Sequence, residues 1–151
     1  MRKILLSSVF VAIVVLTGSS SLAAQRNIEL ATDPVLEADA KHNLDVALQY
    51  YRLKKAYKSV VMRFEETLAA YPQFSRMDEF LYIAGMSSFY LSKNEGKQKV
   101  NLKSEKEKDK YAPEKLKEDA IAYFSMIIDK YPDSKFRADA EKTLKEIKPG
   151  S

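Results

Sequence analysis

The residues with the clearest chemical potential surround the single histidine. His42 has Asp39 three residues before it and Asp45 three residues after it, a spacing that places the three side chains on one face of a helix. Such a trio can hold a proton or form a weak metal site. The sequence contains no cysteine, so a zinc ion would depend on carboxylates around one imidazole. We therefore interpret the trio as a solvated helix face and predict neither a metal nor a cofactor.

Two acidic pairs are the other candidates for chemistry. Glu65-Glu66 and Glu118-Asp119 have the side chains of an acid–base couple, but lysines lie nearby and both pairs fall on predicted helix surfaces. We interpret them as solubilising charge. The sequence also lacks a glycine-rich phosphate loop, a GxSxG motif and an HExxH motif. It therefore predicts a non-enzymatic protein.

The N-terminus has the pattern of an export signal. A basic pair precedes an apolar run of 13 residues, 4–16, which is shorter than the roughly 20 residues of a membrane-spanning helix. Small residues then lead to a cleavage site after Ala23. We predict a signal peptide over 1–23, a tether over 24–32, and an exported, periplasmic protein.

The end of the apolar run is similar to a bacterial lipobox. Leu16-Thr17-Gly18-Ser19 matches it except at the last position, where lipidation requires a cysteine thiol. A serine cannot form the thioether. The stretch is either a lipobox without its cysteine or one of the Gly-Ser segments that are common near cleavage sites.

The remaining chain predicts five helices and no strand. Apolar residues recur at helical spacing over 36–53, 57–71, 80–91, 113–131 and 136–147. Asp33-Pro34 has the residue types of a helix start, and Ser75 is followed by a sequence typical of a capping box. Pro72 and Pro132 are expected to end the helices that precede them.

Charge and composition restrict the partners. Without residues 1–23 the chain holds 23 basic and 21 acidic residues, a balance too even to indicate a nucleic-acid partner. The segment 93–112 is rich in Lys, Glu, Asn and Gln, and we predict a flexible charged insertion there. Its lysines also allow an alternative, an electrostatic contact with anionic lipid or nucleic acid, although acidic residues alternate with several of them.

The helices repeat. The segment from Tyr57 to Tyr71-Pro72 has an echo 60 residues later, which ends at Tyr131-Pro132. Phe64 corresponds to Phe124 in this alignment. Self-similar helix pairs are the signature of a solenoid, in which each pair buries its apolar face against the next.

The repeat resembles the tetratricopeptide repeat (TPR), a helix-turn-helix unit of about 34 residues. Gly85 falls where that family has a small residue that allows a close helix approach. From Leu48 the small residue of the second helix, Val60, follows after 12 residues, whereas from Gly85 the equivalent Ala120 follows after 35. The difference implies an insertion of 23 residues, which fits the charged segment. The expected fold is an all-α, TPR-like α-solenoid of two helix-turn-helix repeats plus a C-terminal capping helix, over residues 33–148.

Within TPR proteins the chain is similar to the BamD family of outer-membrane protein assembly lipoproteins. The segments 70–91 and 129–144 carry this resemblance through Tyr-Pro, then Ser, then an Asp-containing helix start. The chain differs from the family in its missing cysteine, its smaller number of repeats and its insertion.

The resemblance implies two sets of functional residues. The packing set holds the helices together: Leu44, Ala47, Leu48, Tyr51, Val60, Phe64, Pro72, Leu81, Gly85, Ala120, Phe124 and Pro132. The partner-binding set occupies the ligand-facing positions of the first helix in each pair: His42, Asp45, Gln49, Arg52, Glu79, Tyr82, Met86 and Phe89. The last four are unusually apolar, which suits a groove for an apolar segment or partner helix; alternatively, that helix is simply enclosed by its neighbours.

The resemblance therefore implies a cell-envelope scaffold for proteins or peptides, with outer-membrane assembly components as partners. Membrane contact is expected only peripherally or through a partner. Two alternatives stay open. One is a Tol–Pal or peptidoglycan-linked adaptor, and the other is a structural module that self-associates through open solenoid ends.

Overall fold

A computed structural model describes residues 33–101 and 103–148, which all belong to one compact unit, Thr32–Ser151. Its regular elements are all helical: α1 (Pro34–Gln49), the π-helix η1 (Tyr50–Lys54), α2 (Tyr57–Ala70), α3 (Met77–Ser92), α4 (Glu105–Lys110), α5 (Pro113–Lys130) and α6 (Arg137–Ile147). The predicted all-α, TPR-like class is confirmed. The predicted signal peptide and tether, residues 1–32, lie outside the described residues.

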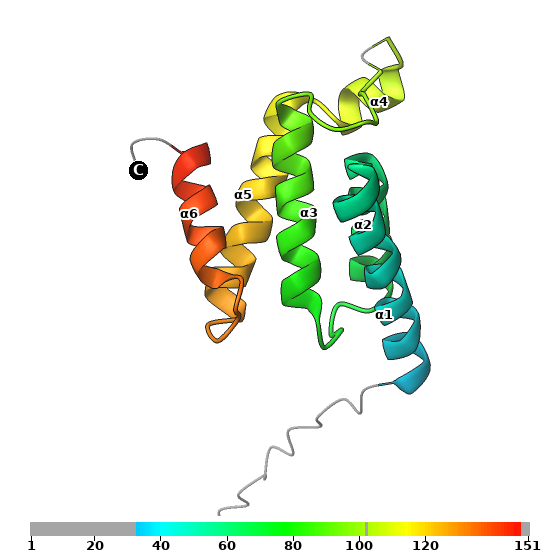
Figure 1. The fold of residues 1–151 in the computed structure, drawn as a ribbon, viewed down its shortest axis with the longest axis vertical. Helices are drawn as coiled ribbons and strands as arrows, with labels where there is room; N and C mark the ends of the chain where they lie inside the picture. The colour runs from blue at the N-terminus through cyan, green and yellow to red at the C-terminus, as the bar shows by residue number, and fades with distance from the viewer. Residues whose placement is uncertain (1–32, 102, 149–151) are drawn as a thin grey trace, which may run out of the picture. The chain divides into compact units, whose positions relative to one another are not determined.

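The helices stack in antiparallel pairs. α3 lies between α2 on one side and α5 on the other, and α6 packs on α5 (Figure 1). One core runs through this stack, and its largest fully buried side chains include Phe64, Phe80 and Phe124. The described unit therefore has its own apolar interior.

The sequence repeat is also a structural repeat. The turn between α2 and α3 and the turn between α5 and α6 share four backbone N–H to C=O hydrogen bonds at an offset of 60: Tyr71–Thr67 and Tyr131–Ile127, Phe74–Tyr71 and Ser134–Tyr131, Met77–Phe74 and Arg137–Ser134, Phe80–Arg76 and Ala140–Phe136. Because α6 begins with the geometry that begins α3, it corresponds to the first helix of a third repeat. Lys142, Lys145 and Glu146 of α6 are exposed, which fits the polar outer surface of a terminal cap.

The helix starts were predicted with mixed success. The Asp33 carboxylate accepts the backbone N–H of Val35 at 2.8 Å and of Leu36 at 3.4 Å, and Pro34 opens α1, so this start is confirmed. The capping box at Ser75 is wrong. Arg76 occupies the N-cap of α3 without a side-chain cap, and Ser75 donates its hydroxyl to the Glu37 carboxylate of α1 instead.

The first helix does not end as a regular α-helix. Its last turn is the π-helix η1, and Lys55 follows in the left-handed region with φ 47°. The backbone N–H of Ala56 donates to the carbonyl of Tyr50 at 3.0 Å, which closes the helix before α2 begins. This turn leaves Leu53 with 75% of its surface exposed.

Helices α3 and α5 approach closely at Gly85. A Cβ atom at this position would lie 2.8 Å from Cε1 of Phe124, which is closer than real Cβ contacts allow. Phe124 is itself fully buried. The ring of Phe124 therefore occupies the space that any side chain at position 85 would need.

The charged segment 93–112 folds back on α2. It contains the short helix α4, and Tyr111 at its end is only 6% exposed. Lys58 pairs with Glu107 at 2.9 Å, Lys110 pairs with Glu65 at 2.6 Å, and Gln98 contacts both the backbone and the hydroxyl of Ser59. Local sequence patterns do not predict these contacts, since they join residues about 40 to 50 positions apart. The flexibility expected of this segment stays a prediction.

Candidate partner-binding face

The trio around His42 lies on the outer surface of the first helix. His42, Asp39 and Asp45 are all exposed on α1, and Asp45 lies 3.7 Å from the Arg76 guanidinium. Across residues 33–101 and 103–148, no three His, Asp or Glu side chains gather closely enough to hold a metal ion. In the same residues, no helix has the length and apolarity that crossing a bilayer requires.

The four predicted partner contacts of the first pair form an open strip. His42, Asp45 and Gln49 follow one another along α1, and Arg52 continues the strip on η1; all four are exposed. A shallow hollow lies at its end, lined by Leu48, Gln49, Arg52 and Leu53. The strip therefore offers polar side chains to a partner beside a few exposed carbons.

The corresponding four residues of α3 are divided by burial. Glu79 is 7% exposed and Phe89 is 6% exposed. The Glu79 carboxylate is held by the Arg76 guanidinium at 2.6 Å, and the Lys93 ammonium lies over the Phe89 ring at 3.7 Å from its centroid. These two side chains therefore belong to internal packing in this structure, unlike the surface groove for which they were predicted.

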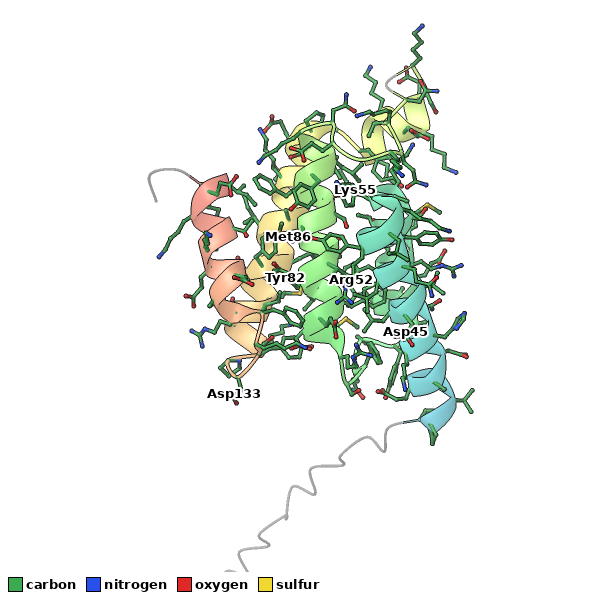
Figure 2. All side chains as sticks on the ribbon, in the orientation of Figure 1. Asp45, Arg52, Lys55, Tyr82, Met86 and Asp133 are labelled. Carbon is green, nitrogen blue, oxygen red and sulfur yellow. The ribbon has the colours of Figure 1, made fainter. Side chains whose placement is uncertain are left out.

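Tyr82 and Met86 are half-buried because the following repeat reaches across α3. The Tyr82 ring stacks on Phe136, just before α6, with centroids 4.9 Å apart. Met86 contacts the hydroxyl of Thr143 on α6 at 3.8 Å. In Figure 2, Tyr82 and Met86 lie along α3, with Asp45 and Arg52 on the neighbouring first helix. The segment around α6 thus covers part of α3, whose main packing partners are α5 and α2.

A tyrosine cluster fills the space between the first helix and α3. Tyr51 lies 5.8 Å from Tyr57, and Tyr57 stacks on Tyr90 at 5.0 Å, measured between ring centroids. Burial raises the pKa of the Tyr51 phenol, and the hydroxyls of Tyr90, Tyr82 and Tyr57 raise it further. Burial also raises the pKa of Tyr82, with a contribution from Asp139. The raised pKa values keep the Tyr51 and Tyr82 phenols neutral near pH 7, so both present hydroxyl groups rather than charges.

The predicted packing set lies where helices meet. The fully or almost fully buried members are Leu44, Ala47, Val60, Phe64, Leu81, Gly85, Ala120 and Phe124. Leu48 and Tyr51 are half-buried at the edge of the core. Pro72 and Pro132 are exposed just beyond the ends of α2 and α5, where they interrupt the helices without packing in the core.

Two contributors to this face were not predicted. Arg76 contacts both Asp45 and Glu79, so it ties the first helix to α3. Tyr90 joins the tyrosine cluster. The four aromatic positions 51, 57, 82 and 90 could have suggested a cluster, but only the antiparallel arrangement of the helices brings them together.

Comparison with known proteins places the chain in a family. The family model described as YfiO, outer membrane lipoprotein, matches residues 16–150. The match begins at Leu16, the first residue of the lipobox-like segment, in which this chain has Ser19. Neither the curated proteins nor the solved structures gave a match. Since the family model covers nearly the whole sequence, the chain belongs to the YfiO family of outer membrane lipoproteins.

Proposed function

We propose that this protein is a non-enzymatic scaffold of the bacterial cell envelope, similar in role to the BamD assembly factors. It acts outside the cytoplasm, next to the outer membrane. Its partner is a protein segment that lies across the first helix and α3. Family membership supports the compartment and the class of partner.

The proposal rests on one observation, that exposed polar side chains and half-buried apolar carbons lie next to each other on this face. α1 and η1 present an exposed polar strip, His42 to Arg52, beside the half-buried carbons of Leu48 and Tyr51. Neutral phenols and amide groups next to apolar carbons suit a peptide, because they hydrogen-bond the backbone while the carbons bury side chains. Because the helices are fixed by one continuous core, the surface loses little conformational entropy on binding.

The test is photo-crosslinking from this face. A photoreactive amino acid at Gln49 is expected to attach to outer-membrane assembly components in living cells, since Gln49 is exposed at the centre of the strip. The matched control carries it at Ala122, an exposed position on α5. Crosslinked partners are identified by mass spectrometry.

The outcomes separate the alternatives. Assembly components crosslinked from position 49 and not from position 122 support the proposal. Crosslinks to Tol–Pal or peptidoglycan-bound proteins from position 49 keep the partner-binding face but replace the assembly role with an adaptor role. Crosslinks to a second copy of the same chain make self-association the function. Equal crosslinking from both positions contradicts a partner-specific face.

A binding variant gives a second test. Gln49→Ala/Arg52→Ala removes two exposed side chains for which the described structure shows no internal hydrogen bond or ion pair, so the fold is expected to persist. Recovery of the crosslinked partner in a pull-down is expected to fall at least about tenfold, which corresponds to roughly 1.4 kcal/mol. Unchanged recovery with a folded variant contradicts the assignment of these two residues.

A further inference from the structure

One end of the described unit carries most of its positive charge. We define the basic end as residues 53–58, 93–101 and 103–110. These residues include ten lysines and four acidic residues, a net charge of +6, whereas the rest of 33–148 holds 12 basic and 16 acidic residues, a net charge of −4. The molecule is therefore electrically polarised although its total charge is small.

The two parts of the basic end form one surface. The backbone N–H of Lys97 donates to the carbonyl of Lys55 at 3.0 Å, and Gln98 and Glu107 bind Ser59 and Lys58. Figure 1 shows the segment around α4 at the same end of the stack as the start of α2, and Figure 2 labels Lys55 at this end. The fold thus adds the cations of 53–58, which have no acidic neighbours in sequence, to those of the insertion.

The pairing within the described residues leaves several lysines of this surface without an acidic partner. Glu107 is engaged by the backbone N–H of Asn101 at 2.8 Å and by Lys58 at 2.9 Å. In contrast, the exposed ammonium groups of Lys55, Lys97, Lys103, Lys106 and Lys108 have no hydrogen bond or ion pair within the described residues. They are available for an external anion.

An exposed apolar side chain lies among these cations. Leu53 has 75% of its surface exposed, the highest value among the large exposed apolar residues described. It stands at the end of η1, immediately before Lys54 and Lys55. An apolar tip flanked by lysines is the arrangement by which peripheral proteins enter the boundary between lipid headgroups and acyl chains.

We propose that the basic end docks on an anionic lipid surface, with the lysines against headgroup phosphates and Leu53 in the interface. Lysines on long flexible stems suit a fluid array of phosphates, whereas a single phosphate site would need a fixed donor geometry. Nucleic acid is disfavoured, because the aromatic residues here, Tyr57 and Tyr111, are at most 7% exposed and cannot stack on bases. The lysines of this contact lie outside the proposed partner-binding face, and Leu53 alone also lines the hollow at the end of that face. The contact holds the chain at a membrane without a lipidated cysteine.

The experiment is flotation of residues 24–151, which contain the whole described core, with lipid vesicles alone. Binding is expected to vesicles of equal parts phosphatidylethanolamine and phosphatidylglycerol, to weaken as salt is added, and to be absent with phosphatidylcholine. Lys97→Glu/Lys103→Glu/Lys106→Glu is expected to weaken binding at least about 100-fold, at about 1 kcal/mol for each lysine. Leu53→Ser is expected to weaken it about tenfold.

A matched control has the same change in net charge elsewhere. Lys41→Glu/Lys130→Glu/Lys142→Glu alters three exposed lysines outside the basic end and is expected to bind within about threefold of wild type, since screening limits their reach. Circular dichroism checks that each variant is helical, and glutamine replaces glutamate if the first variant unfolds.

Three results would overturn the proposal. The first is equal loss of binding in the two triple variants, which would mean that only net charge matters. The second is absence of binding to the anionic vesicles. The third is tighter binding to polyglutamate or to DNA than to the vesicles, lost in the Lys97 variant, which would make a dissolved polyanion the ligand. Because no protein partner is present, none of these results bears on the proposed scaffold role.

Discussion

The two helix pairs share a framework and differ in what lies on their outer surfaces. In the middle of the stack, Phe80 of α3 and Tyr123 of α5 pack against Phe64 of the preceding pair. Their ring centroids lie 5.5 Å and 4.7 Å, respectively, from the centroid of the Phe64 ring. At the equivalent positions the first pair has Asn43 and Arg63, which hydrogen-bond to each other at 3.3 Å. The second pair thus has an aromatic seat, the rings of Phe80 and Tyr123 that contact the neighbouring pair. The first pair has two polar residues at the same positions.

This difference explains how one repeat sequence serves two positions. A helix pair inside a solenoid buries both faces, whereas a terminal pair must keep its outer face soluble. Many inward positions are kept, since Leu44 and Leu81, Ala47 and Ala84, and Phe64 and Phe124 are buried in both pairs. The polar pair at 43 and 63 therefore keeps the outer face of the first pair polar, so that no further helix pair stacks on it.

The largest expected effect tests the shared framework. Phe64→Ala and Phe124→Ala each remove a fully buried ring and are expected to cost about 3–5 kcal/mol of unfolding free energy. Urea denaturation followed by circular dichroism measures both. A cost below about 1 kcal/mol for either one would show that the two pairs do not share one core, and Met62→Ala, an exposed position on α2, serves as the control.

A smaller effect is expected where the pairs differ inside the core. Gly85→Leu gives the second pair the residue of the first, and its Cβ would lie 2.8 Å from the buried Phe124 ring. We expect a loss of about 1–3 kcal/mol from overpacking. Leu48→Ala in the first pair, where the side chain is half-buried, is expected to cost less. A Gly85→Leu variant as stable as wild type would mean that α3 and α5 can separate without penalty.

The next prediction exchanges the outer surfaces. Asn43→Phe/Arg63→Tyr copies the aromatic seat of the second pair onto the end of the stack. Stability is expected to change by less than about 1 kcal/mol, because both positions are only partly buried. The variant is expected to self-associate, because no helix packs against its new aromatic seat. Sedimentation that depends on protein concentration measures this association.

The control for this exchange is Lys41→Phe/His42→Tyr, which places the same aromatic residues at exposed positions on the same helix. It is expected to associate less, because these positions do not correspond to the aromatic seat. If both variants stay monomeric at all concentrations, polarity at 43 and 63 is not what closes the stack.

The sequence was sufficient for the framework because periodicity and proline positions are local signals. The five helices, the 60-residue repeat and the close approach at Gly85 all follow from such patterns. The partner face was harder, since carrying over ligand-facing positions treats each pair alone, whereas the start of α6 covers α3 and buries part of Tyr82. To see that Asn43 and Arg63 correspond to Phe80 and Tyr123, one needs both repeat spacings: 37 residues between the first helices of the pairs and 60 residues between the second helices.

The segment present only in the second pair offers the smallest effect. The backbone N–H of Asn101, and then the Lys58 ammonium, lower the pKa of Glu107 below its ordinary 4.5. A lowered carboxylate pKa means that its contribution is complete above pH 4.5 and is lost as the pH falls through the lowered value. The segment 93–110 is therefore expected to loosen from α2 in acid while the core stays folded.

NMR of the Asn101 and Ser59 amides, the second of which donates to Gln98 at 3.1 Å, follows this step. In Glu107→Gln the acid transition of the Asn101 amide is expected to disappear, and a wild-type midpoint at or above 4.5 would show that the carboxylate does not hold the segment.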